Sequence, residues 1–251
     1  KTDQVNTLGI KELIGKGEAN FSGSIPNRIF NLKKAAGYMN GVLVAPGETF
    51  SLGATIGDIS KVTGYREAYV ISEGRTVLGD GGGVCQVSTT LFRAVLNAGL
   101  PVVERKAHVY RVGYYEQDMG PGYDATVFFP STDLKFVNDT AGHILIQTKV
   151  DAKNFSMRYE IYGTDDGRIA TISAPKIYSQ SPALATVYQD DPTLPVGTLK
   201  QVDWSAPGAK VSFDYKVVRN GEILQDRTFT STYRPWAAVY LKGTGQLTAS
   251  N

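Results

Sequence analysis

The sequence is poor in the residues that build disulfide frameworks and metal centres. Its 251 residues include one cysteine, Cys85, and two histidines, His108 and His143. A single cysteine cannot close an intramolecular disulfide, and these three residues cannot form a cysteine-rich zinc site. We therefore expect neither a metal nor another cofactor.

Strong net charge and long apolar runs are also missing. The formal net charge is +2, which gives no electrostatic reason to expect a nucleic-acid partner. The longest apolar runs are short, as at 144–146, whereas a membrane helix needs about 20 apolar residues. Because the sequence begins at Lys1 without a signal-like segment, we expect any membrane anchor to lie outside it.

What is present predicts an α+β protein with two helices and an antiparallel sheet. Apolar residues recur at helical spacing over 27–40, and Leu91, Val95 and Ala98 form a second helical stripe that ends at Gly99. From Val102 onward the apolar period is two, which is typical of strands. The strands that we expect are 42–44, 49–51, 109–115, 124–129, 135–137, 144–150 and 155–162. Helices followed by an antiparallel sheet indicate the α+β class.

The glycine- and aspartate-rich segment 163–167 is the best candidate for a linker between two domains. We expect one domain over 1–163 and a small all-β domain over 168–251. The second part shows no helical stripe, and Asn220-Gly221 predicts a type I′ hairpin turn.

Cys85 is the most informative residue, because it follows Gly81, Gly82 and Gly83 where a glycine loop becomes the first turn of a helix. A helix N-terminus lowers a thiol pKa and offers N–H groups to an oxyanion. The loop and the adjacent Gln86 are thus candidates for substrate contact. The alternative is a buried cysteine that acts as a small hydrophobe beside a tight turn.

A cysteine nucleophile needs a base, and histidine suits this role best. His108 is favoured over His143 because charged residues surround it, although either could be an ordinary residue at a strand edge. Asp124 or Glu104 could orient the imidazole, and Asp124 could equally be a turn residue. Two arginines are candidates for binding a substrate carboxylate, with a solvated surface role as the alternative; they are Arg105 and Arg111.

The sequence resembles the VanW family over roughly residues 20 to 150. The resemblance lies in several separate motifs that occur in the family's order. They are the run 81–91, Asn31 with Ala35-Ala36, Asn40-Gly41, the run 46–51, Gly64-Tyr65, Glu104-Arg105 with His108, and Asp124-Ala125-Thr126.

Residues of about 168 to 245 resemble a G-five domain, a small β module of bacterial surface proteins. The matching glycines are Gly197, Gly208, Gly221 and Gly243. Ser205 stands where this family would have another glycine. The resemblance implies binding to wall glycan, such as N-acetylglucosamine.

These resemblances imply a peptidoglycan L,D-transpeptidase that forms 3-3 cross-links between stem peptides. Cys85 would be the nucleophile of a thioester acyl-enzyme, His108 the acid–base group and Asp124 its partner. The implied location is extracellular, in the cell wall or on the surface of a Gram-positive bacterium. Two alternatives stay open: a non-catalytic wall-binding protein and a cysteine peptidase or amidase that acts on wall peptides.

Overall fold

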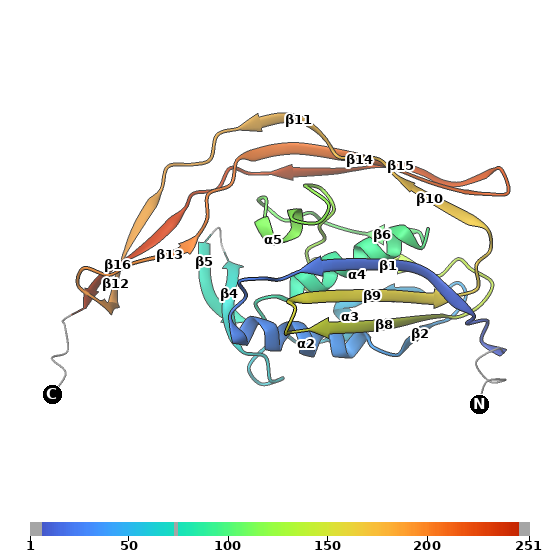
Figure 1. The fold of residues 1–251 in the computed structure, drawn as a ribbon, viewed down its shortest axis with the longest axis horizontal. Helices are drawn as coiled ribbons and strands as arrows, with labels where there is room; N and C mark the ends of the chain where they lie inside the picture. The colour runs from blue at the N-terminus through green and yellow to red at the C-terminus, as the bar shows by residue number, and fades with distance from the viewer. Residues whose placement is uncertain (1–6, 73–74, 246–251) are drawn as a thin grey trace.

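The computed structural model describes residues 7–72 and 75–245. Its first sheet has the order β1-β9-β8-β2, and all of its pairs are antiparallel. These strands are β1 (Glu12–Asn20), β2 (Val42–Val44), β8 (Ile144–Asp151) and β9 (Ser156–Gly163). Two long helices, α2 (Pro26–Met39) and α4 (Val84–Asn97), pack on this sheet (Figure 1). The α+β class is therefore confirmed.

The helix α4 lies unusually close to the edge strand β1. A Cβ atom on Gly15 would come within 2.5 Å of the Ala98 Cβ, and one on Gly17 within 2.2 Å of the Thr90 carbonyl oxygen. Only glycine permits this approach, and the two glycines alternate along β1 so that both face the helix. The strand β1 thus forms the surface on which α4 packs.

Smaller elements surround this layer. They are β3 (Thr49–Ser51), α3 (Leu52–Ile56), β4 (Glu67–Ser72), β5 (Arg75–Asp80), β6 (Val102–Glu104), α5 (Gly113–Glu116) and β7 (Lys135–Val137). The strands expected at 109–115 and 124–129 are wrong. The first contains the short helix α5, and the second forms only an isolated bridge, between Phe128 and Thr132.

The described residues beyond 167 contain strands only. They are β10 (Arg168–Ile172), β11 (Lys176–Ser181), β12 (Val187–Pro195), β13 (Leu199–Asp203), β14 (Gly208–Arg219), β15 (Glu222–Tyr233) and β16 (Val239–Gly245). The hairpin turn between β14 and β15 is confirmed, because Arg219 pairs with Glu222 and both Asn220 and Gly221 have positive φ.

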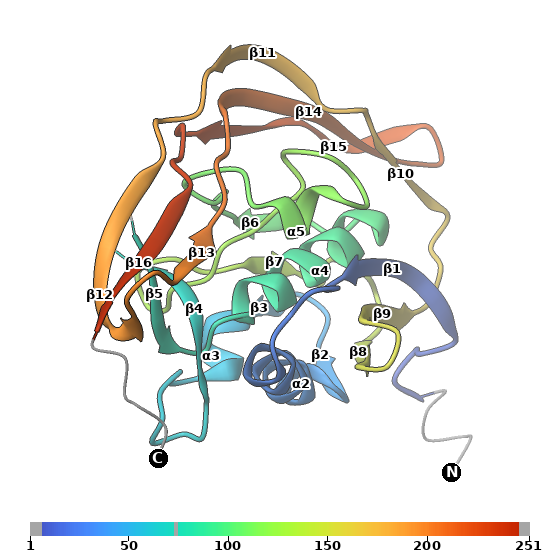
Figure 2. The same ribbon diagram turned by 60° about the vertical axis from the view of Figure 1, so that its left-hand side comes forward.

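The C-terminal strands pack against the helix α4. The β14–β15 hairpin arches over α4 (Figures 1 and 2), and its Phe213, Tyr215 and Phe229 belong to the same buried cluster as Phe92 and Leu96 of α4. The Tyr215 hydroxyl donates to the Leu96 carbonyl at 3.0 Å. The strands that follow the segment 163–167 therefore share a buried core with the helix α4.

Candidate active site

The glycine loop before α4 is packed against the protein itself. A Cβ on Gly82 would lie 2.6 Å from the Tyr69 carbonyl oxygen, and one on Gly81 would lie 2.1 Å from the Ile59 side chain. Gly83 is the N-cap of α4, with φ of 113°. We expected these glycines to let a substrate approach, but the contacts show that they let the loop approach α2 and the β4–β5 hairpin.

Cys85 lies in the first turn of α4 and is half-buried. Its Sγ atom is 3.4 Å from the Thr126 Oγ1 atom and 3.6 Å from the Val127 carbonyl oxygen. The cysteine is therefore neither sealed among aliphatic side chains nor fully in solvent, and a nucleophile requires this intermediate position.

His108 and Asp124 form a buried pair beside Cys85. The His108 Nδ1 atom is 2.6 Å from the Asp124 Oδ2 atom, and the His108 backbone N–H donates to the same oxygen at 2.7 Å. The ring packs against Tyr115 with centroids 4.7 Å apart. The Nε2 atom is buried and has no hydrogen-bond partner in the described part of the chain. It is thus available for a proton from Cys85 or from a substrate.

The electrostatics of these groups favour a thiolate–imidazolium pair. Burial raises the pKa of the Cys85 thiol, but the interaction with the neighbouring His108 ring and the charge of that ring more than offset this effect and lower the pKa to about 7. Burial lowers the pKa of His108, whereas the hydrogen bond to Asp124 and the interaction with Cys85 raise it to about 9. Between these values the thiol is ionised while the imidazole is protonated. Asp124 stays ionised, because the stabilising partners around its carboxylate outweigh the effect of burial and hold its pKa well below the ordinary range.

The comparisons with known proteins agree with this arrangement of motifs. A family model described as VanW like protein matches residues 27–161. The chain belongs to the VanW family. It is 36% identical over 169 residues to the uncharacterized protein YoaR of Bacillus subtilis (strain 168), which covers 67% of this chain and 54% of that protein. It is also 38% identical over 115 residues to the vancomycin B-type resistance protein VanW of Enterococcus faecalis (strain ATCC 700802 / V583), covering 45% and 42%.

The chain spans about half the length of the curated relatives it matches. Two solved G5 domains are also similar to part of it. The IgA1 protease G5 domain is 21% identical with a TM-score of 0.20, covering 34% of this chain and 100% of that chain. The G5 domain of HP0197 is 17% identical with a TM-score of 0.16, covering 30% and 97%.

Two of the residues expected in the site lie elsewhere in the VanW region, 27–161. His143 directly precedes β8, where its backbone N–H donates to the Leu8 carbonyl at 2.8 Å. Glu104 lies 2.8 Å from the Lys135 Nζ atom and accepts the backbone N–H of Asp133. Of the alternatives left open by the sequence, the structure thus brings His108 and Asp124 to Cys85.

The residues expected to contact substrate are committed to the protein. Gln86 is fully buried, accepts a hydrogen bond from Arg28 at 2.7 Å and donates to the Asn20 carbonyl. Arg105 donates to the Asp124 and Gly122 carbonyls, each at 2.7 Å, and its side chain is 3% exposed. The sequence made both residues candidates for substrate contact, but both side chains hydrogen-bond within the protein, and Arg105 contacts Asp124 of the site.

Arg111, the second arginine considered for a carboxylate, makes a two-point ion pair with Glu116 at 2.8 and 2.7 Å. This pair occupies the planar face that a substrate carboxylate would use. In the parts of the chain that the structure describes, no group of three or more His, Cys, Asp or Glu side chains is arranged to hold a metal. No described helix is long and apolar enough to span a membrane.

Sequence reasoning missed two residues that build the site. Arg93 on α4 is 1% exposed, and its guanidinium donates to the Tyr115, Tyr123 and Glu18 carbonyls. It thus anchors the α5 segment, against which His108 packs. Tyr233, at the end of β15, donates its hydroxyl to Asp124. An arginine within an apolar helix is a detectable signal, but nothing in the local sequence of Tyr233 connects it with residue 124.

Proposed function

We propose that this chain is a cysteine acyltransferase of the bacterial cell wall, an L,D-transpeptidase that forms 3-3 cross-links. The observation that supports the proposal is the lowered pKa of Cys85 beside the buried His108–Asp124 pair. This is the arrangement that activates a thiol nucleophile: a base within reach and a third group that orients it. The substrate class rests on the VanW resemblance.

The proposed reaction has two steps that share one thioester. The Cys85 thiolate attacks the diaminopimelate carbonyl of a tetrapeptide stem, and the bond to D-Ala breaks as protonated His108 gives its proton to the leaving amine. The side-chain amine of a second stem then attacks the thioester. His108 takes the proton of that amine, and the C–S bond breaks to restore the thiolate.

We assign the oxyanion of each tetrahedral intermediate to the backbone N–H of Cys85. N–H groups in the first turn of a helix have no intrahelical acceptor. Those of Val84 and Gln86 already donate to the Gly81 and Gly83 carbonyls, at 3.1 and 2.8 Å. Loss of one oxyanion donor typically costs about 2.7–4 kcal/mol, so a small displacement of this turn would be costly.

Product analysis tests the proposal and separates its alternatives. Purified protein and its Cys85→Ala variant are incubated with tetrapeptide stems, and the products are identified by mass spectrometry. Release of D-Ala together with 3-3 dimers, by the wild type alone, is the expected result. Shortened monomers without dimers would identify a peptidase. Unchanged stems would instead leave a wall-binding protein without this activity.

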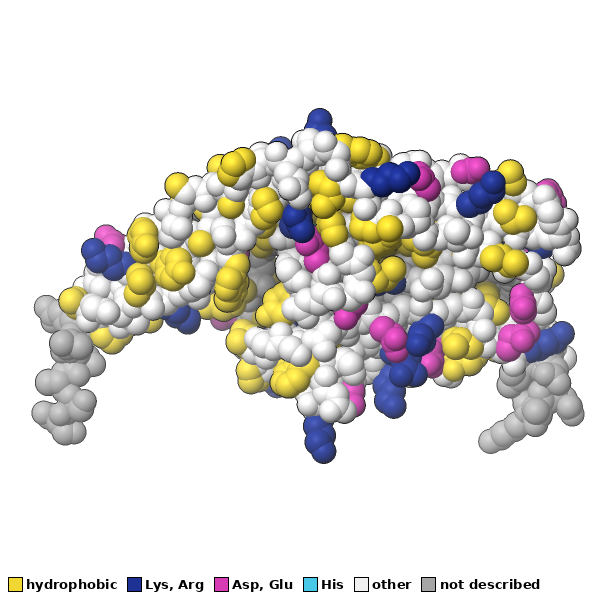
Figure 3. Space-filling model, turned by 45° about the horizontal axis from the view of Figure 1, so that its top comes forward, with side chains coloured by type: hydrophobic (Ala, Val, Ile, Leu, Met, Phe, Trp, Pro, Cys, Tyr) yellow, Lys and Arg dark blue, Asp and Glu magenta, His cyan; other side chains and the backbone are white. Residues whose placement is uncertain are grey.

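We also propose that the C-terminal strands contact wall glycan and that the protein works outside the membrane. Three aromatic side chains are prominently exposed there: Tyr178 at 61%, Tyr188 at 62% and Trp204 at 65%. Figure 3 shows hydrophobic side chains along the arm that these strands form. Exposed aromatic rings present flat apolar faces with a polar edge, which suits a sugar ring.

A sedimentation assay with insoluble peptidoglycan checks this second assignment. Replacing Tyr178, Tyr188 and Trp204 together by alanine should lower the bound fraction while leaving activity on soluble stems unchanged. N-acetylglucosamine oligomers should compete with binding of the wild type. Unaltered sedimentation of the triple variant would rule out this surface.

A further inference from the structure

The loop that carries His108 is held by the C-terminal strands as well as by its own region. The Arg234 N–H donates to the Val109 carbonyl at 2.7 Å. The Tyr110 ring stacks on Trp236, with centroids 4.1 Å apart and planes 16° apart. Ala107 packs against a small buried cluster that includes Tyr233. The residues on both sides of His108 therefore depend on the segment just after β15.

The two oxygens of Asp124 divide between these regions. Oδ2 accepts both bonds from His108. Oδ1 accepts the Tyr233 hydroxyl and lies 3.3 Å from the Arg105 Nη2 atom. Arg105 is held in turn by the Thr230 carbonyl at 3.2 Å and the Ser231 hydroxyl at 3.0 Å. One carboxylate oxygen therefore binds His108, and contacts from β15 fix the position of the other oxygen.

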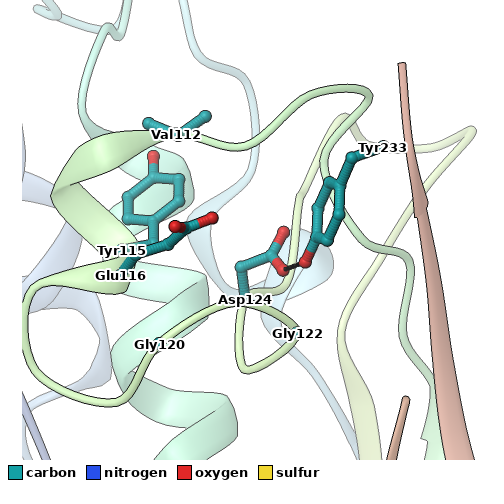
Figure 4. A pocket seen from close by; sticks show the side chains of 7 residues that line it. All are labelled: Val112, Tyr115, Glu116, Gly120, Gly122, Asp124 and Tyr233. Atoms are coloured by element: carbon teal, nitrogen blue, oxygen red, sulfur yellow. Dashed lines mark hydrogen bonds between the residues drawn. The ribbon is translucent and has the colours of Figure 1, made fainter. Parts of the chain in front are cut away.

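The contacts around the Asp124 carboxylate are shielded from solvent. Asp124 and Tyr233 are each 4% exposed. Figure 4 shows the Tyr233 hydroxyl hydrogen-bonded to the Asp124 carboxylate beside a small cavity, which Tyr115 and Glu116 also line. The cavity volume is about 10 Å³, which is roughly one water molecule. The orientation of Asp124 is therefore set by protein groups.

We propose that Tyr233 is a positioning residue of the active site, supplied by β15 and acting through Asp124 on His108 and Cys85. Its hydroxyl holds the ionised carboxylate in the rotamer that meets the His108 Nδ1 atom. Without that hydroxyl the carboxylate can turn, the imidazolium loses a fixed partner, and less thiolate forms at a given pH. This inference rests on the proposed role of Cys85, His108 and Asp124.

The test measures the reactivity of Cys85 directly, in the chain of 251 residues. The rate of alkylation by iodoacetamide is followed from pH 5 to 10 for the wild type and for Tyr233→Phe, which keeps the ring and its packing. We expect the midpoint of the rate curve to move up by about one pH unit, so that the rate at pH 6 falls about tenfold.

Thr228→Val is the matched control, because it also removes one hydroxyl from β15. The Thr228 hydroxyl donates to Asp214 at 2.7 Å within the C-terminal strands, so its loss should leave the midpoint unchanged. A second variant, Ser231→Ala, removes one contact to Arg105 and should move the midpoint in the same direction by less. A folded Tyr233→Phe protein with the wild-type midpoint would overturn the inference, as would a lower melting temperature without any shift.

The outcome is separable from that of the proposed function. Alkylation reports the thiolate alone and requires no wall peptide, whereas dimer formation reports acyl transfer. A shifted midpoint without 3-3 dimers would refute the transpeptidase and keep the positioning role. Dimers together with an unshifted midpoint would refute the positioning role and keep the enzyme.

Discussion

The VanW region and the C-terminal strands differ in how they bury their apolar residues. In the first, helix α4 is buried along most of its length between the sheet and its neighbours. In the second, β14 alternates between buried and exposed positions, while β12 exposes most of its residues. Each buried cluster that contains residues from beyond 167 also includes or packs against residues of the VanW region. The VanW region thus contains most of the core, and the C-terminal strands cover part of that core.

The same division holds for chemistry. The VanW region contains Cys85, His108 and Asp124. Tyr233, at the end of β15, donates to Asp124, and the backbone of Arg234 donates to Val109, the neighbour of His108. A region that only bound a ligand would not need to reach the carboxylate of the His108–Asp124 pair. The comparison therefore supports the proposal that the C-terminal strands also position the candidate site.

Removing residues 168–251 is the most severe way to test this comparison. It would expose the cluster around Phe92 by deleting Phe213, Tyr215 and Phe229. Truncation of one such phenylalanine to alanine costs about 3–5 kcal/mol, and whole domains have only about 5–15 kcal/mol of stability. We expect the fragment 1–167 to lose cooperative thermal unfolding by circular dichroism. A fragment that melts like the full chain would show that the VanW region folds alone.

Replacing His108 by alanine should lower the rate of acyl transfer about 10²- to 10⁴-fold, the usual contribution of an acid–base group. His143→Ala is the matched control and should change the rate less than twofold, because His143 lies at the start of β8. Single-turnover release of D-Ala measures both. Equal losses in the two variants would contradict the assignment of His108.

The pH dependence of the reaction should follow the two shifted groups. Because the pKa of Cys85 is lowered to about 7, the rate should fall about tenfold for each pH unit below that value as the thiol is protonated. It should fall again above about 9, where His108 loses the proton that the leaving amine needs. A profile of D-Ala release from pH 5 to 10 measures both limbs. A midpoint near pH 9 on the acid limb would mean that Cys85 is an ordinary thiol.

Two glycine substitutions give the smallest expected effects, of opposite sign. Gly82→Ala places a methyl group 2.6 Å from a carbonyl oxygen, and overpacking of this kind costs about 1–3 kcal/mol. Gly37 lies inside α2 with nothing within 4 Å of its would-be Cβ, so Gly37→Ala should stabilise by about 0.4–1 kcal/mol. Urea unfolding measures both. Stabilisation by Gly82→Ala would contradict the explanation that close packing requires glycine at this position of the loop.

Local patterns were sufficient for several of the regular elements. The helix over 27–40, the helix after the glycine loop and the strands near 135, 144 and 156 follow from periodicity and turn residues, and the structure contains them. The segment 108–129 did not follow, because its backbone is held by distant partners: Arg105, Arg93 and the Thr89 hydroxyl bind its carbonyls or N–H groups. Strand propensity there was overridden by tertiary contacts.

The sequence by itself determined the position of Cys85 at the start of a helix, since a glycine loop and an apolar stripe are both local signals. It also made His108 the favoured base. Tertiary structure alone decided that Asp124 rather than Glu104 meets His108, and that Tyr233, 109 residues away from Asp124, shares its carboxylate. The reason is that a hydrogen bond between distant segments depends on how the whole core packs, and no local pattern records that packing.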